Sequence, residues 1–335
     1  MDSVEGIDIP PAWQRSAEKI IVGNHRRVIV LGGADSGKST FCAFLVQRLL
    51  DAGFKTTFID CDVGQKDLGP PACLSSATLK PGHRLEGSGF SGIVADGHYF
   101  IGAVAPARHL LPMAVGVRHL VDSARGRFAV INTTGFIHGI GRVLKSYKIE
   151  SALPDLILGI ERSHELKSIL TPYRNRQIVR VRPSYLAKSK SPAQRRAARE
   201  AAFKRYFQQA LPVRLELRRL IFQRSLIFSG TPMDRTGFIH FEKTSEGPLA
   251  VGEFSEDIGL KLVRPGFEER LLCGVADTGN HCLGLGVIER IDFEEKTVSL
   301  MTPVPERRIR IIQLGNIYLG PEGQEIDRKK VDEVW

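Results

Sequence analysis

The sequence predicts an α/β protein whose doubly wound parallel sheet is followed by a small C-terminal all-β domain. Through the first two thirds of the chain, apolar segments of strand length alternate with helical segments, which is typical of repeated βαβ units. From about residue 225 the chain changes to short apolar strands joined by turn-rich links, with strands expected at 226–230, 270–276, 283–288, 297–300 and 308–312. The expected division is a short N-terminal helix in residues 1–24, an α/β domain in 25–224 and a β-rich domain in 225–335.

The elements of the α/β domain follow one another in the order that this fold requires. A helix with proline at its start occupies residues 10–22, and a first apolar strand follows at 28–31. The next helix spans 41–50 and ends before Gly53, a residue suited to a C-terminal cap. Further strands are expected at 55–62, 127–133, 155–160 and 177–181, with helices at 109–124 and 164–170. Polar residues gather at the carboxyl ends of the strands, where an open α/β sheet binds its ligands.

The first strand leads into residues 32–40, which fit the pattern G-x-x-x-x-G-K-[ST] of a phosphate-binding P-loop. Gly33 and Gly37 let the backbone curl so that its N–H groups point inward. Lys38 can then act on the outer phosphates, and the Ser39 hydroxyl can ligate Mg²⁺. A strand before the motif and a helix after it favour a P-loop NTPase fold that binds ATP or another nucleoside triphosphate. The residues expected to cradle the triphosphate are Gly33, Ala34, Asp35, Ser36, Gly37, Lys38, Ser39 and Thr40.

Two carboxylates end the strand that follows the P-loop helix. Asp60 and Asp62 are two residues apart, so strand alternation is expected to send both to the same side, near the phosphate site. A carboxylate there can hold Mg²⁺ or its waters, or accept a proton from an attacking hydroxyl, and phosphoryl transfer needs both. We expect Asp60 to contribute to the metal site together with Ser39.

The net charge of +10 is concentrated in one segment. Residues 174–224 contain fifteen Arg or Lys against two Glu, a net charge of +13, so the rest of the chain is slightly acidic. This asymmetry indicates a polyanionic partner such as nucleic acid. The five cysteines are spread along the chain, which suits a reducing compartment, and no apolar stretch approaches the roughly 18 residues of a membrane helix. A cytoplasmic protein that does not bind membranes is expected.

Four sequence motifs follow one another along the chain. The first motif is the P-loop. The second, D-x-D-x-G-Q, matches residues 60–65, and the third, N-T-x-G-[WF]-x-x-G-x-G, matches residues 132–141. The fourth, S-x-x-x-R-x-x-x-R followed by an aromatic pair, matches residues 191–199 and 206–207. In this order the motifs resemble those of the polynucleotide 5′-hydroxyl kinases, a family that includes the RNA kinases of pre-mRNA cleavage and of ribosomal RNA processing, and the fourth motif corresponds to the family's lid. The chain departs from eukaryotic relatives in having almost no N-terminal domain and in carrying Phe136 where they more often carry tryptophan.

This resemblance implies a reaction and a set of residue roles. The γ-phosphoryl group of ATP, or of another nucleoside triphosphate, would pass to the 5′-hydroxyl end of RNA or DNA. Asp62 would be the base that deprotonates the 5′-hydroxyl, and Gln65 would position the acceptor or the metal waters. The clasp on the acceptor strand would consist of Thr133, Thr134, Gly135 and Phe136. The lid, expected at about residues 188–207, would bring Arg195 and Arg199 over the phosphates from one helix face.

Two other functions are compatible with part of this pattern. A P-loop GTPase or ATPase switch would use the same loop, but the chain lacks the N-K-x-D element that recognises guanine, and the clasp and lid would have no task. A nucleotide-bound scaffold for RNA processing would keep the fold without kinase activity. The intact Lys38, Asp62 and Arg195 argue against such a loss of chemistry.

Overall fold

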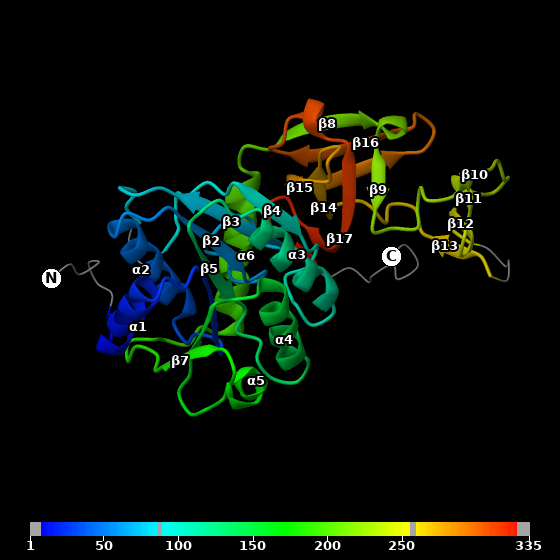
Figure 1. The fold of residues 1–335 in the computed structure, drawn as a ribbon. Coiled ribbons are helices and arrows are strands. Elements are labelled where there is room, and N and C mark those ends of the chain that lie inside the picture. Colours follow the sequence, from blue (N-terminus) through cyan, green and yellow to red (C-terminus); the bar gives the residue numbers. More distant parts are fainter. Residues whose placement is uncertain (1–7, 86–88, 255–258, 327–335) are drawn as a thin grey trace. The chain divides into compact units, whose positions relative to one another are not determined.

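The computed structural model describes residues 8–85, 89–254 and 259–326 of the chain (Figure 1). The outer ends of the expected N-terminal and C-terminal segments lie outside these described residues. Within the three ranges, no helix has both the length and the apolar character that crossing a membrane requires.

The chain divides into two compact units, Met1–Arg199 and Glu200–Trp335. The boundary falls inside helix α6 (Pro192–Phe207), so this helix begins in the first unit and ends in the second. The expected boundary near residue 225 lies further along the chain. The difference arises because strand β8 (Leu211–Glu216) pairs with a strand of the second unit and belongs to its sheet.

The first unit is built on a seven-stranded sheet with the order β4-β3-β2-β5-β1-β6-β7. Strands β2, β5, β1, β6 and β7 run parallel, which confirms the expected parallel sheet. These strands span Thr56–Cys61, Phe128–Thr133, Arg27–Gly32, Leu156–Ile160 and Gln177–Val181. Because β2, β5 and β1 are neighbours, their carboxyl ends bring residues 60–65, 132–141 and 32–40 to one edge of the sheet.

Two antiparallel strands extend this sheet beyond β2, and the apolar pattern does not reveal them. β3 (Cys73–Leu79) pairs with β2, and β4 (Gly97–Phe100) pairs with β3. β3 is buried although it contains serines, because side chains from β4 and the residue before it satisfy the hydroxyl groups of Ser75 and Ser76. Ser75 Oγ, for example, is hydrogen-bonded to Nδ1 of His98 at 3.0 Å. A polar strand that is satisfied by its neighbours has no apolar signature in the sequence.

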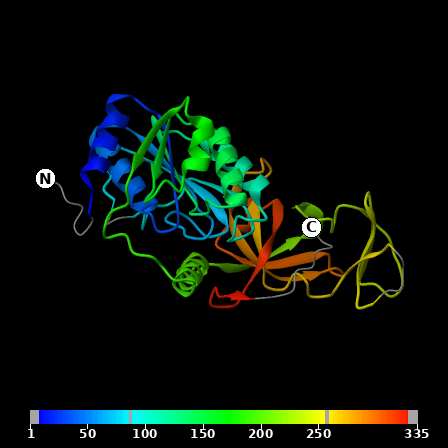
Figure 2. The same ribbon diagram turned by 90° about the horizontal axis from the view of Figure 1, so that it is seen from below.

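Helices cover both faces of this sheet, as a doubly wound fold requires (Figures 1 and 2). The helices of one face are α1 (Pro11–Val22) and α2 (Lys38–Asp51), and those of the other are α3 (Leu110–Asp122), α4 (Ile140–Ala152) and α5 (Lys167–Leu170). The helix expected at 164–170 is shorter than predicted and continues as a 3-10 turn at Thr171–Tyr173.

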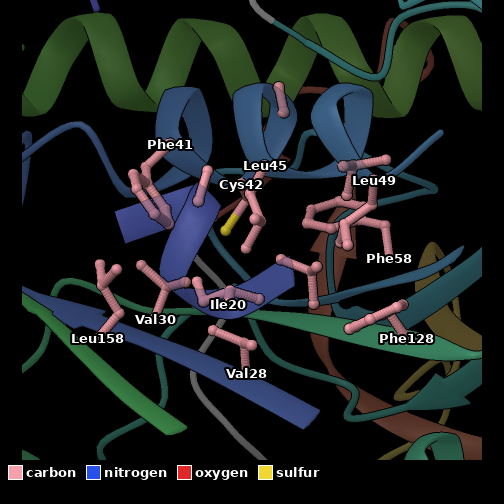
Figure 3. Packing of buried hydrophobic residues seen from close by; sticks show 14 of the residues in the cluster. Ile20, Val28, Val30, Phe41, Cys42, Leu45, Leu49, Phe58, Phe128 and Leu158 are labelled. Atoms are coloured by element: carbon pink, nitrogen blue, oxygen red, sulfur yellow. The ribbon is translucent and has the colours of Figure 1, made fainter. Parts of the chain in front are cut away.

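The apolar side of α2 packs onto the strands beneath it (Figure 3). Phe41, Leu45 and Leu49 recur at helical spacing, and all three are fully buried. They belong to the same core as Val30 of β1. α1 joins this core through Trp13, whose ring meets that of Phe41 edge-on at 5.3 Å. This packing holds α2, and with it the P-loop, against the sheet.

The second unit is all-β, which confirms the expected change of fold along the chain. Its larger sheet has the order β18-β17-β14-β15-β16-β8, with β9 beside β17, and a smaller sheet has the order β10-β11-β12-β13. Besides β8, the strands are β9 (Ile221–Gln223), β10 (Thr231–Pro232), β11 (His240–Thr244), β12 (Gly247–Val251), β13 (Lys261–Val263), β14 (Leu271–Ala276), β15 (Cys282–Asp292), β16 (Thr297–Thr302), β17 (Ile311–Leu319) and β18 (Glu325–Ile326). Residues 226–230, expected as a strand, form turns instead, because Phe228 has a φ of 64° and the apolar side chain of Ile227 points into the core of this unit.

The packing of α2 generates a stability prediction. Replacing Leu45 by Ala should lower the free energy of unfolding by about 2–5 kcal/mol, because it removes a fully buried side chain and leaves a cavity. Leu111 of α3 is 76% exposed, so Leu111→Ala is the matched control and should have little effect. Urea denaturation followed by circular dichroism measures both changes. Equal losses in the two variants would contradict the described packing.

Candidate functional site

The P-loop joins β1 to α2 and is shaped for a phosphate group. Gly37 begins α2 with a φ of 85°, and a Cβ at this position would lie 3.1 Å from the Trp13 ring, so glycine is required. Because Gly37 has no side chain to cap the helix, the amides of the first turn are left to bind an anion. The Lys38 ammonium group donates to the Gly33 carbonyl at 2.6 Å and so lies folded over the loop. Burial lowers the pKa of Lys38, and the negative charge of Asp62 opposes this shift.

Asp60 is the next-to-last residue of β2 and is fully buried. Its Oδ2 accepts hydrogen bonds from the amides of Asp67 at 3.0 Å and Leu68 at 3.2 Å, and it lies 3.1 Å from the Lys66 ammonium. Its Oδ1 accepts a hydrogen bond from the Asp62 amide at 3.1 Å. The carboxylate of Asp60 therefore holds together the loop that follows β2.

Asp62 lies in that loop, beyond the last residue of β2, and it lines a cavity in front of the P-loop. Its Oδ1 accepts hydrogen bonds from the amides of Gly64 at 3.0 Å and Gln65 at 3.1 Å, which orient the carboxylate. The side-chain amide of Gln65 donates to the Arg195 carbonyl at 3.2 Å. Gln65 therefore connects the loop after β2 to helix α6, which carries the lid arginines. No sequence pattern indicates this contact.

The clasp follows β5 and approaches the P-loop closely. A Cβ on Gly135 would lie 2.6 Å from the backbone of Ala34, so glycine is needed where the two loops meet. Thr134 and Phe136 line the cavity beside it. Thr133 is fully buried instead, and its hydroxyl donates to a backbone carbonyl of β1 at 2.8 Å. Thr133 therefore supports the sheet, while the other three clasp residues face the cavity.

Two residues without an expected role lie beside Ser39. The side-chain amide of Asn132 donates to the Ser39 hydroxyl oxygen at 3.3 Å. The Ser39 hydroxyl also lies close to the carboxyl group of Asp67, which lines the cavity. Burial, followed by the charge of Asp60, raises the pKa of Asp67 to about 6, and the nearby Ser39 hydroxyl opposes this rise. The sequence signal for Asp67 is an acidic residue two positions after Gln65, just outside the D-x-D-x-G-Q pattern.

Two lysines of α4 are fully buried behind the clasp. Lys145 Nζ donates to the backbone carbonyl of Thr134 and, at 3.1 Å, to its hydroxyl oxygen. Lys148 Nζ donates to the Cys61 carbonyl at 2.9 Å. Burial lowers the pKa of both lysines. No sequence motif includes them, although both occupy helical positions of α4 that share a buried face with Leu144.

The beginning of α6 carries the lid arginines. Arg195 Nη2 lies 2.5 Å from Oδ2 of Asp35 in the P-loop. The same carboxylate oxygen accepts a hydrogen bond from the Lys190 amide at 3.0 Å. Arg199 follows one helical turn later and lines the cavity. Asp35 therefore anchors the start of the lid to the P-loop.

The four motifs surround one cavity of about 730 Å³, a volume within the range of about 300–1,000 Å³ that small-molecule sites occupy. The expected site residues that line it are Ala34, Asp35, Ser36, Gly37, Lys38, Ser39, Thr40, Asp62, Gln65, Thr134, Gly135, Phe136, Arg195 and Arg199. The expected site residues outside its wall are Gly33, Asp60 and Thr133. Unexpected residues of the wall include Asp8, Trp13, Asp67, Ser184, Leu186 and Lys188.

The P-loop at the carboxyl edge of a doubly wound sheet defines the chain as a P-loop nucleotide-binding protein. Residues 32–209 match the family described as mRNA cleavage and polyadenylation factor CLP1 P-loop, and the chain belongs to this family.

The chain is similar to proteins of known sequence over nearly its whole length. It is 31% identical to the polyribonucleotide 5′-hydroxyl-kinase of Methanocaldococcus jannaschii, over 92% of this chain and 91% of that protein. It is 30% identical to the polyribonucleotide 5′-hydroxyl-kinase of Pyrococcus furiosus, over 95% of both. Among solved structures, it resembles the wild-type Clp1p–Pcf11p complex with a TM-score of 0.61 at 13% identity, covering 91% of this chain and 77% of that one. This structural likeness shows a shared fold.

The close approach of clasp and P-loop generates a prediction about nucleotide affinity. Gly135→Ala should weaken the affinity for ATP by about tenfold or more, or about 1.4 kcal/mol, because its Cβ would push the Ala34 backbone away. Leu111→Ala, at an exposed position of α3 outside the cavity wall, is the control and should keep the affinity. Titration with a fluorescent ATP analogue gives both affinities. Unchanged binding by the Gly135→Ala variant would show that the two loops can separate at no cost.

Proposed function

We infer that this protein is a polynucleotide 5′-hydroxyl kinase, which transfers the γ-phosphoryl group of a nucleoside triphosphate to the 5′-hydroxyl end of a nucleic-acid strand. The observation that carries this conclusion is the shared cavity, where the P-loop, Asp62, the clasp and the lid arginines lie in one wall. The two archaeal relatives are named polyribonucleotide 5′-hydroxyl-kinases, and these names favour RNA as the preferred acceptor.

The donor half of the cavity has the groups that ATP with Mg²⁺ requires. The first-turn amides of α2 can bind phosphate oxygens, and Lys38 needs only to leave the Gly33 carbonyl to reach the outer phosphates. The Ser39 hydroxyl lies beside the Asp67 carboxyl group, and such oxygen donors are the ligands that Mg²⁺ prefers. A bound magnesium ion would neutralise charge on the β- and γ-phosphate oxygens.

The acceptor half is formed by Asp62 and the clasp. In the proposed step, the 5′-oxygen bonds to the γ-phosphorus, the bond from that phosphorus to the β–γ bridging oxygen breaks, and the 5′-hydroxyl proton passes to the Asp62 carboxylate. The two amides that hold Oδ1 of Asp62 keep this base in place. Thr134 and Phe136 would hold the end of the strand, with the ring of Phe136 offering a face to a base. The products are a 5′-phosphate end and the nucleoside diphosphate.

The lid would complete the site. Arg195 and Arg199 carry permanent charge on planar groups that suit the charge spread over a transferring phosphoryl group. Their position in the cavity wall would also exclude water, which would otherwise accept the phosphoryl group. A GTPase or ATPase switch, or a scaffold without chemistry, has no use for an ordered base, clasp and lid around one cavity, so the kinase is the better supported function.

The kinase function is tested by mixing the protein, Mg²⁺ and γ-labelled ATP with matched oligonucleotides. Label should enter RNA with a 5′-hydroxyl end and leave RNA with a 5′-phosphate end unlabelled, because only the former has an acceptor oxygen. A DNA strand of the same sequence measures the preference for RNA. Hydrolysis of ATP without transfer to either strand would replace the kinase by an ATPase switch, and the absence of both reactions would favour the scaffold.

The role of Asp62 is tested by Asp62→Asn. The variant should lose about 10²–10⁴-fold in the rate of transfer, because an amide cannot accept the proton, while its affinity for ATP stays close to that of the unmodified protein. Asp51→Asn is the matched control, since Asp51 forms an exposed ion pair with Arg84 at the end of α2. Single-turnover transfer and ATP titration separate the two effects. Full activity of Asp62→Asn would assign the base to another residue.

A further inference from the structure

One carboxylate oxygen beside the P-loop is unsatisfied. Oδ2 of Asp67 is buried, and within residues 8–85, 89–254 and 259–326 it has no hydrogen-bond partner. Asp67 lines the cavity, and its carboxyl group lies beside the Ser39 hydroxyl. A buried carboxylate oxygen without a partner is costly unless a ligand satisfies it. The position of Asp67 in the cavity wall indicates that this ligand enters with the nucleotide.

Asp60, the acidic residue expected at the metal, is already fully engaged. Both of its oxygens accept hydrogen bonds from backbone amides, and the Lys66 ammonium lies 3.1 Å from Oδ2. It is fully buried and lies outside the cavity wall. One of the amides that it binds is that of Asp67 itself, at 3.0 Å. Asp60 therefore fixes the backbone from which the Asp67 side chain extends.

The hydrogen bonding of Ser39 leaves room for a cation. Its hydroxyl oxygen accepts a hydrogen bond from the side-chain amide of Asn132 at 3.3 Å, and the carboxyl group of Asp67 lies beside it. A hydroxyl oxygen has two lone pairs, so one lone pair of Ser39 remains for a metal ion. β5, the strand beside β1, ends with Asn132 and Thr133, so it supplies no carboxylate of its own. Asp67 brings a carboxylate to this place from the loop after β2.

The chemistry of this site fits a hard divalent cation. Mg²⁺ is bound in proteins by one or two carboxylates together with substrate phosphates. The neighbouring ammonium groups are directed elsewhere, Lys66 to Asp60 and Lys38 to the Gly33 carbonyl. We propose that Asp67 is the carboxylate of the magnesium site, with Ser39 as the hydroxyl ligand and Asp60 as the residue that positions Asp67. The proposal rests on the proposed function in one respect, that the metal arrives with a nucleoside triphosphate.

The test measures how strongly Mg²⁺ improves nucleotide binding, independently of transfer. The affinity for a fluorescent ADP analogue is measured with Mg²⁺ and with EDTA, and the ratio of the two affinities reports the metal site. Asp67→Asn should reduce this ratio by about tenfold or more, because one metal ligand is lost. Its affinity in EDTA should equal or exceed that of the unmodified protein, since a negative charge near the phosphates is removed. Asp67→Glu, which keeps the carboxylate, should retain part of the ratio.

Controls separate this proposal from folding and from the kinase function. Asp51→Asn, at an exposed position of α2, should keep the full ratio, and thermal melting verifies that Asp67→Asn is folded. An unchanged ratio in folded Asp67→Asn would overturn the metal assignment, even if the unmodified protein transfers phosphate. If the affinity ratio between Mg²⁺ and EDTA is reduced in Asp67→Asn, the metal assignment is supported. This holds even if the unmodified protein transfers no phosphate and the kinase function fails.

Discussion

The buried carboxylate of Asp60 is the constraint on which the acidic side of the cavity depends. It is enclosed at the end of β2, where a charge is tolerated only because donors surround it on both oxygens. Those donors are amides of the loop that follows, the Lys66 ammonium and the side-chain amide of Asn132. The bonds that satisfy one buried charge therefore also give the loop its shape. Asp60 binds the backbone amides of Asp62 and Asp67, and the side chains of these two residues line the cavity.

Buried lysines have the corresponding role on the side of the clasp. Lys145 and Lys148 reach the site from α4, and each donates to a backbone carbonyl at the edge of the sheet. Removing ammonium groups from water is expensive, and the carbonyl acceptors offset part of that cost. Lys145 holds Thr134, and Lys148 holds Cys61 at the end of β2. Buried charges of both signs thus determine where the acceptor half of the cavity lies.

The sequence predicts the parts of this protein whose rules are local. The P-loop is identified by a pattern of eight neighbouring residues and a strand before them, and the five parallel strands follow from continuous apolar runs. Strand β3 escapes prediction because its serines are satisfied by partners distant in sequence. Lys145 and Asp67 escape for the same reason, since a charged residue in a sequence gives no sign of burial until its partners are known. The contact of Arg195 with Asp35 also joins segments 160 residues apart.

Strand alternation explains why Asp60 and Asp62, expected on one side, have different surroundings. The alternation rule holds only while the chain is extended, and β2 ends at Cys61. Asp60 still obeys the pleat and is enclosed by its own loop, whereas Asp62 already belongs to the turn, where amides of Gly64 and Gln65 direct its carboxylate. Thr133 shows the complementary case, because it is the last residue of β5 and its side chain stays within the sheet. At the carboxyl edge of a parallel sheet, the residue at which the strand ends therefore decides which side chains become structural and which can act on a ligand.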